Sequence, residues 1–255
     1  KGRMHLVTHV SDLSSDQMSQ ATLRLDAMQG CLKAALPDEF IAPKVSPKLE
    51  EQDFVSSYGE AQFKADVVRL KEYIVAGDVM QVILSQRLSC AFESEPLNLY
   101  RALRALNPSP YMYFMDLETV QIVSSSPEIL ARLEHGEVTV RPLAGTRRRG
   151  RTPEEDIEME RELRADPKEQ AEHLMLIDLG RNDIGRVCET GTVAVSEMMT
   201  IERYAHVMHL ASNVCGRLKP GLTAIDVLKA TLPVGTLSGA PKVRAIEIID
   251  ELEPT

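Results

Sequence analysis

Cysteine is scarce in this 255-residue chain, which contains four. Cys31, Cys90, Cys188 and Cys215 lie far apart, and no CxxC pair or Cys/His pair has the spacing of metal ligands. This pattern argues against a zinc site and against a disulfide framework. It is typical of a protein whose thiols stay reduced, and it predicts a cytoplasmic location.

Long apolar runs and an excess of positive charge are also absent. No segment approaches the roughly 20 consecutive apolar residues of a membrane span. The formal net charge of −9 argues against a nucleic-acid partner, because one basic cluster at 147–151 does not make a basic face. The first residues, "KGRMHLVTHV", lack a signal peptide and an initiator methionine, so we expect this chain to be part of a longer protein.

Residues 1–56 have the pattern of a strand, a helix and a linker that precede the main domain. Residues 5–10 have the composition of a strand. Apolar residues recur every three or four positions over 14–36, which predicts an amphipathic helix. Prolines amid mixed charge over 37–57 predict a loop or linker.

Residues 57–255 form the predicted main domain. Ser57 and Glu60 have the spacing of a capping box, ahead of a helix that we expect to end near Gly77. The segment from Met80 is expected to become a strand. Further helices are expected at 96–106, 153–165, 167–181, 223–231 and 240–252, and strands at 111–116, 120–124, 129–133, 137–141, 192–196 and 206–215.

The order of these elements predicts the fold class. The strands between 111 and 141 follow one another without intervening helices, which suggests an antiparallel meander with a turn at His135-Gly136. Most of the helices fall in the second half of the chain. Strands and helices that are segregated in this way indicate an α+β fold rather than alternating βαβ units.

Two glutamates open a largely apolar helix in the stretch "DPKEQAEHLMLIDLGRND" at 166–183. Spacings of three and four residues put Glu169, Glu172 and His173 on the same side of that helix. Carboxylates that enter an apolar region are hydrogen-bonded, neutralised or bound to a cation, because burial of bare charge is costly. Mg²⁺ often takes one or two carboxylates plus substrate oxygens. The alternatives are a solvent-facing pair or ion pairs with Lys168 or Arg181.

Two loops have the composition of anion-binding segments. In "PVGTLSGAPKVRA" at 233–245, glycines and hydroxyls precede a helix whose first N–H groups suit a carboxylate or phosphate. This loop is neither a Walker loop nor a GxGxxG motif. In "RPLAGTRRRGR" at 141–151, Thr146 and the arginines suit an anionic ligand. The structural alternatives are an ordinary loop and cap, and a solvated basic loop beside acidic residues.

His209 lies in the stretch "YAHVMHLASNV". Period-two alternation puts Val207, His209 and Ala211 on one face of the predicted strand. The near-neutral pKa of histidine makes His209 a candidate for proton transfer. A histidine among apolar neighbours is also often a core residue, and the sequence leaves both interpretations open.

Seven stretches taken together resemble the chorismate-utilising enzymes, most closely the large subunits that make anthranilate. These stretches are "GDVMQVILSQRL", "NPSPYMYF", "SSSPEIL", "RPLAGTRRRG", "KEQAEHLMLIDLGRNDIGRV", "YAHVMHLASNVCG" and "GTLSGAPKVRAIEIID". The resemblance covers roughly residues 57–255, and residues 1–56 match the preceding part of the family less distinctively. It implies an α+β fold of orthogonally packed antiparallel sheets with surrounding helices.

The resemblance also implies a reaction. Chorismate and ammonia would become anthranilate and pyruvate in tryptophan biosynthesis, with Mg²⁺ as cofactor. A glutamine amidotransferase subunit (component II) would deliver the ammonia. By position, Glu172 is expected to bind Mg²⁺, Glu169 to line the same site, and Glu128 to sit at the metal and substrate pocket. Mg²⁺ on the ring carboxylate acts as a Lewis acid when the C4 hydroxyl departs.

Other positions are expected to contact the substrate. Gly145 and Thr146 would touch chorismate, and Thr236 would lie at its ring. His209 would be the acid or base near the departing enolpyruvyl group, hypothetically the acid that protonates it. Chorismate carries two carboxylates, so cationic and N–H donors suit it.

Two positions discriminate within the family. Relatives that add water carry a lysine base where Gln81 stands, and an amide cannot act as a base, so we predict ammonia as the nucleophile. Relatives that aminate through a covalent adduct often place a lysine where Ala144 stands. The alternative function is a phenazine-type synthase that stops at 2-amino-2-deoxyisochorismate. An alternative of another class is a non-catalytic piece that only binds the amidotransferase.

The resemblance ends with the chain. Relatives continue past "IDELEPT" through a substrate-binding tyrosine and arginine and a second Mg²⁺-binding glutamate, so we expect these 255 residues alone to be inactive, with half a metal site. Pro110, Tyr111 and Met112 match one wall of the family's tryptophan pocket. This match points to L-tryptophan as a feedback inhibitor of the intact protein.

Overall fold

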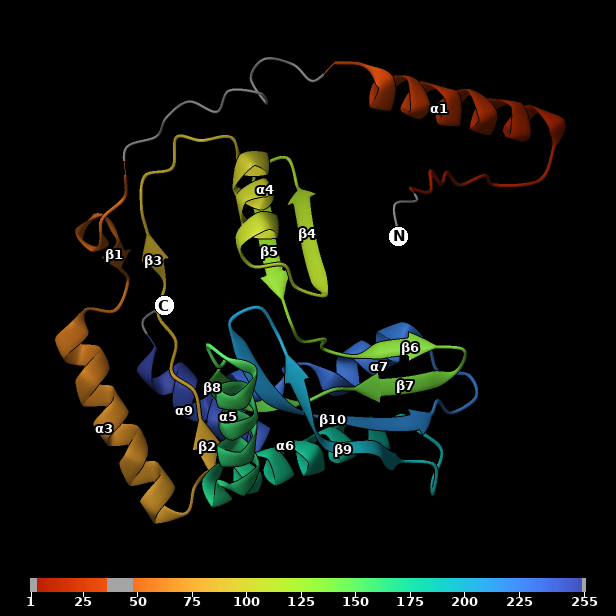
Figure 1. The fold of residues 1–255 in the computed structure, drawn as a ribbon. Helices are drawn as coiled ribbons and strands as arrows, with labels where there is room; N and C mark the ends of the chain where they lie inside the picture. The colour runs from red at the N-terminus through yellow and green to blue at the C-terminus, as the bar shows by residue number, and fades with distance from the viewer. Residues whose placement is uncertain (1–3, 36–47, 254–255) are drawn as a thin grey trace. The chain divides into compact units, whose positions relative to one another are not determined.

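The computed structural model describes residues 4–35 and 48–253 and groups the chain into two compact units, residues 1–47 and residues 48–255 (Figure 1). In the first unit, α1 (Ser15–Lys33) forms where the periodicity predicts a helix, and Ser14 caps it. The strand predicted at 5–10 is absent, because the described part of this unit offers no second strand to pair with it. Residues 36–47 of the predicted linker lie outside the described residues.

The second unit begins with η1 (Glu51–Asp53), β1 (Val55–Ser56) and α3 (Glu60–Ala76). The predicted capping box is wrong, because Gly59 is the N-cap and no side chain caps this helix. Ser57 instead exchanges hydrogen bonds with Arg87 beside the antiparallel pair of β1 and β3 (Leu88–Ser89). The helix ends at Gly77, as predicted.

A helix and a hairpin follow. They are α4 (Pro96–Leu106), β4 (Tyr111–Asp116) and β5 (Gln121–Ser126), all close to their predicted positions. β4 and β5 pair antiparallel, and the rings of Tyr100 on α4 and Phe114 on β4 lie 6.5 Å apart between centroids. This contact holds the hairpin on the helix. The hairpin matters for the site because Glu128 lies two residues after the end of β5.

A five-stranded antiparallel sheet follows the hairpin. Its strands are β6 (Arg132–Glu134), β7 (Glu137–Val140), β8 (Leu143–Arg148), β9 (Ala194–Arg203) and β10 (Val207–Arg217). β10 pairs with β7 and β8 along one edge and with β9 along the other. The predicted meander is therefore only partly correct. β4–β5 and β6–β7 are hairpins, but β5 and β6 do not pair and belong to different sheets. β7 pairs with β10 instead, because this long strand offers hydrogen-bonding partners on both edges.

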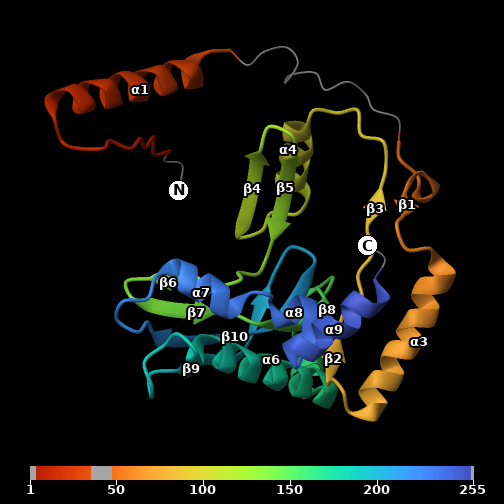
Figure 2. The same cartoon turned by 180° about the vertical axis from the view of Figure 1, so that it is seen from behind.

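Helices cover this sheet. α5 (Pro153–Ala165) and α6 (Pro167–Gly185) begin at the predicted prolines, and α6 runs along the sheet in both views (Figures 1 and 2). α7 (Ala224–Thr231), α8 (Gly235–Ser238) and α9 (Lys242–Leu252) follow β10, and α8 contacts both α6 and α9. Between α8 and α9, β11 (Gly239–Ala240) pairs with β2 (Gln81–Val82). Helices and antiparallel strands are segregated, which confirms the predicted α+β class.

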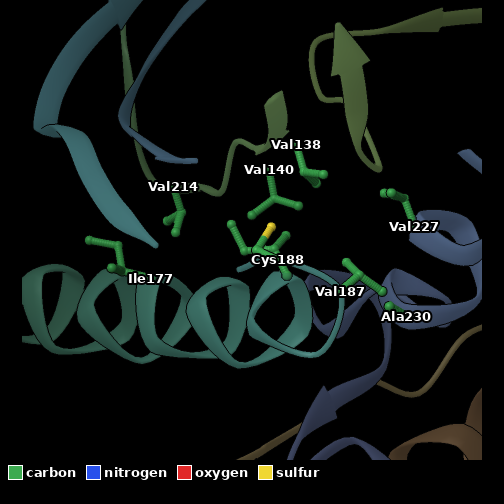
Figure 3. Packing of buried hydrophobic residues seen from close by; sticks show 9 residues of the cluster. Val138, Val140, Ile177, Val187, Cys188, Val214, Val227 and Ala230 are labelled. Carbon is green, nitrogen blue, oxygen red and sulfur yellow. The ribbon is translucent and has the colours of Figure 1, made fainter. Parts of the chain in front are cut away.

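The main core lies between α6 and the strands β7 and β10 (Figure 3). Val138, Val140 and Val214 of the strands belong to one buried cluster with Ile177 of α6 (Figure 3), and Ile184 of α6 is a further member. A smaller cluster joins α5 to the sheet through Leu163, Met208 and Leu210. The first cluster holds α6 against the sheet, and the second holds α5, the helix that leads into α6.

We expect Leu163→Ala to lower the free energy of unfolding by about 3 kcal/mol, because it leaves a cavity beside a fully buried side chain. Ile157→Ala on the same helix is the matched control. Ile157 is 55% exposed, so its loss should change stability by less than about 0.5 kcal/mol. Urea denaturation of both variants tests this. Equal losses would show that α5 is not packed as described.

Candidate functional site

Hydrogen bonds and ion pairs of carboxylates hold the first turn of α6. The Asp166 carboxylate accepts the backbone N–H groups of Lys168 (3.0 Å) and Glu169 (3.3 Å). Asp166 also accepts Arg147 Nη2 at 2.8 Å, and Arg147 Nη1 reaches Glu169 Oε1 at 3.4 Å. Glu169 is therefore neutralised by an arginine of β8. An ion pair to Lys168 or Arg181, which the sequence left open, is not what forms.

The Glu172 carboxylate is hydrogen-bonded by a neutral amide and not by an arginine. Gln81 Nε2 on β2 donates to Glu172 Oε1 at 3.1 Å, and Gln81 Oε1 is buried without a hydrogen-bond partner. In the part of the chain that the structure describes, Glu172 forms no ion pair. A half-buried carboxylate with only an amide against it is suited to a cation or to a donor on a ligand.

His173 is a core residue. Its ring is fully buried, and burial lowers its pKa to about 4, so it is neutral at pH 7. Nε2 lies 2.7 Å from Ser212 Oγ on β10, and Ser212 Oγ accepts the backbone N–H of Met199 on β9 at 2.9 Å. His173 thus ties α6 to two strands of the sheet. His173 Nδ1 is buried and has no hydrogen-bond partner among the described residues.

β8 carries a bulge at Gly145, where its register with β10 shifts after His209. Gly145 has a φ of 66°, and a Cβ at this position would lie 2.9 Å from Leu163 Cδ1 and 3.2 Å from Glu169 Oε2. The positive φ and the close approach both require glycine. The bulge brings the backbone of the "AGT" turn next to the first turn of α6.

His209 is held by this bulge. Its Nδ1 lies 3.0 Å from the Gly145 carbonyl oxygen and 3.1 Å from Thr146 Oγ1. A carbonyl oxygen only accepts, so Nδ1 carries a proton and Nε2 holds the lone pair of the neutral ring. The ring is half-buried rather than part of the core, so the core interpretation is wrong. Nε2 is the atom left to exchange a proton with a ligand.

A pocket lies between α6, the β7–β8 connection, residues 128–130 and residues 231–236. Its polar lining consists of Glu128, Arg141, Asp183, Thr231 and Thr236. Burial raises the pKa of Glu128 to about 7, although the Leu143 backbone N–H and the Thr236 hydroxyl donate to its carboxylate and oppose the shift. Glu128 therefore exchanges a proton near neutral pH.

A buried ion pair supports one wall of this pocket. Lys242 Nζ lies 2.7 Å from Asp183 Oδ1, and the two side chains are 13% and 11% exposed. Nζ also donates to the carbonyl oxygens of Thr231 (3.3 Å) and Pro233 (3.0 Å). These bonds hold residues 231–233, which lead to Thr236 on α8, next to Asp183 of α6. Our sequence reasoning missed this pair, because no local pattern couples "GRND" to "GAPK".

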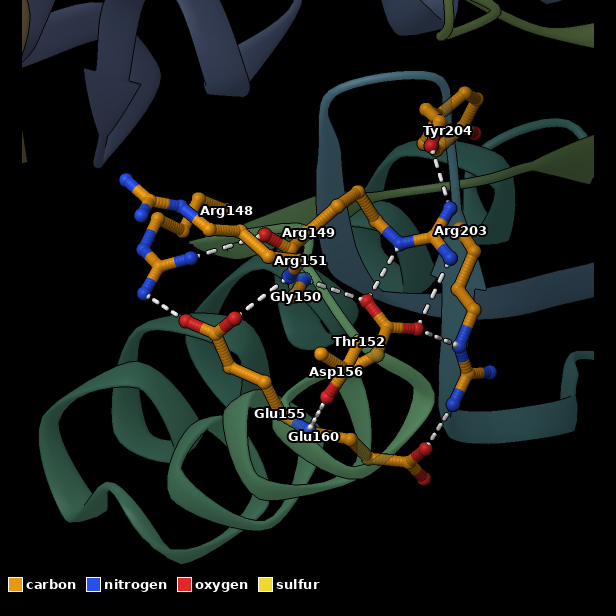
Figure 4. A network of polar contacts seen from close by, with 10 residues as sticks. All are labelled: Arg148, Arg149, Gly150, Arg151, Thr152, Glu155, Asp156, Glu160, Arg203 and Tyr204. Atoms are coloured by element: carbon orange, nitrogen blue, oxygen red, sulfur yellow. Dashed lines mark hydrogen bonds and ion pairs between the residues drawn. The ribbon is translucent and has the colours of Figure 1, made fainter.

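Three of the arginines in 147–151 are paired with carboxylates, among them Arg147, whose partners lie at the start of α6. Arg149 makes a bidentate pair with Asp156 of α5, at 2.7 and 3.0 Å, and Arg148 pairs with Glu155 (Figure 4). Arg203 on β9 contacts the same Asp156 carboxylate at 3.2 Å. For Arg148 and Arg149 the alternative interpretation holds, because the acidic residues that follow in sequence fold back as α5 and pair with them.

The predicted site residues fall into neighbouring groups along α6. One group contains Gly145, Thr146, His209 and Glu169; a second contains Glu128 and Thr236; Glu172 lies with Gln81. The helix face that starts at Glu172 continues at helical spacing through Leu176 and Leu179 into the pocket lining. Pro110, Tyr111 and Met112 lie at the start of β4 and are not part of that lining.

Within residues 4–35 and 48–253, no group of three or more His, Cys, Asp or Glu side chains is placed to hold a metal ion. Any metal at Glu172 would therefore take few ligands from this part of the chain. None of the helices in the same ranges combines the length and the apolar character needed to cross a bilayer.

The α+β scaffold and the carboxylate-lined pocket are those of an enzyme domain for a small polar ligand. Residues 5–255 match the family of chorismate binding enzymes, and the chain belongs to this family. It is 53% identical over 254 residues to anthranilate synthase component 1 of Neisseria meningitidis serogroup B. It is 52% identical over 253 residues to the same component of Pseudomonas putida.

These two alignments cover 100% and 99% of this chain, whereas the chain spans about half (51%) of each relative. The crystal structure of anthranilate synthase component I from Streptococcus pneumoniae TIGR4 superposes with a TM-score of 0.83 at 43% identity and covers 95% of this chain and 52% of that one. The menaquinone-specific isochorismate synthase of Escherichia coli shares the fold, with a TM-score of 0.73 at 18% identity over 93% of this chain and 54% of that one.

We expect Thr236→Val to raise the pKa of Glu128 further, by about one unit, because the variant loses a hydroxyl that donates to the charged carboxylate. Carbon-13 NMR of glutamate carboxyls measures this, with Glu128→Gln to assign the signal. Ser238→Ala is the control, since the Ser238 hydroxyl donates to the Val234 carbonyl instead. An unchanged midpoint in Thr236→Val would contradict the contact.

His173 should make stability depend on pH. Its folded-state pKa of about 4 lies below the ordinary value of 6.5, so the unfolded chain binds more protons as the pH falls between these values. This group alone should reduce the free energy of unfolding by about 3 kcal/mol from pH 7 to pH 4. Subtracting the same curve for His173→Asn isolates the effect. Parallel curves would mean that His173 is accessible to protons in the folded state.

Proposed function

We propose that this chain is the chorismate-binding part of an anthranilate synthase large subunit. The observation that carries this proposal is identity of about one half to anthranilate synthase component 1 along the whole chain. The reaction is a carbon–oxygen lyase step in which chorismate and ammonia give anthranilate, pyruvate and water. Ammonia adds at C2 as the C4 hydroxyl leaves, and pyruvate is then eliminated.

The environment of Glu172 supports ammonia as the nucleophile. Gln81 stands where water-adding relatives are expected to carry a lysine base, and its amide donates to Glu172 Oε1 at 3.1 Å. An amide cannot take a proton from water, whereas ammonia is nucleophilic without a base. Ala144 on β8, where other relatives are expected to carry a lysine, offers no nucleophile for a covalent adduct.

Glu172 is our proposed Mg²⁺ ligand. Its carboxylate is half-buried and not neutralised by a described cation, and such oxygen donors fit a hard divalent ion. Glu169 is paired with Arg147, so it would line the site rather than add a second free charge. When bound, Mg²⁺ supplies Lewis-acid polarisation of the ring carboxylate and orients the departing hydroxyl.

We propose that two groups of this chain move protons in the reaction. His209 keeps its Nδ1 proton on the Gly145 carbonyl, so Nε2 exchanges the proton needed for pyruvate elimination. Glu128 has a pKa of about 7 and lies in the pocket beside Thr236. Gly145 and Thr146 would contact the substrate beside His209, and Thr236 would contact its ring.

We also propose the partners expected from this function. A glutamine amidotransferase subunit would supply ammonia, and the complex would work in the cytoplasm. Pro110, Tyr111 and Met112 would form part of an L-tryptophan site at the start of β4, where the first two are exposed. These assignments are tested by copurification with the amidotransferase and by tryptophan titration of the full-length protein.

The deciding experiment uses the protein encoded by the complete reading frame, with chorismate, ammonium and Mg²⁺. We expect anthranilate and pyruvate, identified by fluorescence and mass spectrometry. Glu172→Gln and His209→Ala should lower the rate of pyruvate release at least about a hundredfold, because each removes a group that acts on the reacting centre. Glu158→Gln, on the exposed face of α5, should leave the rate unchanged.

Three results would overturn parts of this proposal. An aminated product that keeps its enolpyruvyl ether identifies a synthase that stops at 2-amino-2-deoxyisochorismate. No conversion, together with copurification of the amidotransferase, identifies a binding subunit only. An unchanged rate in His209→Ala removes that residue from proton transfer.

A further inference from the structure

A row of three polar side chains crosses the sheet at His209. In the strand register, His209 on β10 lies opposite Thr146 on β8 and opposite Glu202 on β9. Residues directly opposite each other on antiparallel strands present their side chains on one face, with Cβ atoms about 4.5–5.5 Å apart. Glu202 is therefore a carboxylate next to the imidazole, and neither the sequence motifs nor the resemblance assigned it a role.

Glu202 does not bond to His209 but holds the residue that packs on it. The Tyr204 hydroxyl donates to Glu202 Oε2 at 2.6 Å. The Tyr204 and His209 rings lie 5.6 Å apart between centroids with an interplanar angle of 61°, which is an edge-to-face contact. The ring of Tyr204 thus packs against the imidazole of His209, whose Nδ1 is hydrogen-bonded to the Gly145 carbonyl.

Tyr204 is also fixed at its backbone. Its N–H donates to the Val207 carbonyl at 2.8 Å, which closes the turn between β9 and β10. Its carbonyl accepts Arg149 Nη1 at 2.9 Å (Figure 4). Hydrogen bonds at both the backbone and the hydroxyl of Tyr204 restrict its ring. The fold therefore fixes the contact between this ring and His209.

The same carboxylate is joined to the pocket. Arg141 lines the pocket, and its Nη1 donates to Glu202 Oε2 at 2.7 Å. Arg141 Nε donates to Asn213 Oδ1 at 2.9 Å on β10. A continuous set of contacts therefore runs from the pocket wall through Arg141, Glu202 and Tyr204 to the ring of His209.

We propose that Tyr204 and Glu202 are positioning residues for His209. They keep the imidazole on the Gly145 carbonyl, so that Nε2 points in one direction when a proton is exchanged. The claim about ring position stands on the geometry of this chain, and its catalytic consequence rests on the proposed function. Misplacement of a reacting group by about 1 Å can cost on the order of a hundredfold in rate.

The first arm of the test is NMR of the histidine ring in this chain, with His209→Gln to assign the signals. Tyr204→Leu should shift the His209 ring-proton resonances, because it removes the ring current of a close aromatic neighbour. Tyr100→Leu is the matched control. Tyr100 is also a half-buried tyrosine in edge contact with a ring, that of Phe114 on the hairpin, and its loss should leave the His209 signals in place.

The second arm measures kcat and KM of the full-length protein. Tyr204→Leu should lower kcat by about ten- to a hundredfold with KM changed less than about twofold, because ring orientation matters in the proton-transfer step. Tyr204→Phe and Glu202→Gln keep the ring and test its hydroxyl anchor, and each should lower kcat by a smaller factor. If Tyr204→Leu fails to fold, these two conservative variants decide the question.

The two arms separate the two claims. If the His209 signals and kcat are unchanged in Tyr204→Leu, the positioning role is wrong and the proposed function stands. If the full-length protein converts no chorismate but the signals shift as expected, the proposed function is wrong and the ring contact stands. A fall in kcat that equals the effect of Tyr100→Leu would show a general loss of stability instead.

Discussion

The close packing of α6 on the sheet is the constraint on which the rest of the structure depends. A Cβ at Gly180 would lie 2.9 Å from Val140 Cγ2, so the helix and strands approach within the reach of a single methyl group. Nearer the start of α6, the imidazole of His173 forms a hydrogen bond with Ser212 of β10 and not with a ligand. Between these two contacts the helix cannot rotate, and the carboxylates of its first turns are presented to fixed neighbours.

Three carboxylates of the site are kept in partly buried positions by three different means. Glu169 is neutralised by Arg147, Glu172 is hydrogen-bonded by the neutral amide of Gln81, and Glu128 has a pKa of about 7 through burial. The carboxyl group therefore has different chemistry at each of these three positions. A paired charge shapes the site, an unpaired one is free for a cation, and a carboxyl that titrates near pH 7 exchanges protons.

Much of the fold was predictable, because its signals are local. α4 and α5 begin at Pro96 and Pro153 and end where predicted, since proline at the first helical position and apolar periodicity act within a few residues. The failures share a cause. The strand at 5–10 does not form because the described residues offer no strand to pair with it. Ser57 bonds to Arg87 instead of capping α3, so both outcomes depend on segments outside the local pattern.

The sequence by itself determined the family, the α+β class and the residue types of the site, because helix caps, strand periods and motif letters are properties of neighbouring residues. It also marked His209 and Glu128 as residues of interest without saying which atoms they would offer. Only the tertiary structure decided that Arg147 belongs to Glu169, that Lys242 holds Asp183, and that Tyr204 lies on His209. Hydrogen bonds and ion pairs depend on distances of a few ångströms between segments that are far apart in the chain, and these distances exist only after the sheet and α6 have packed.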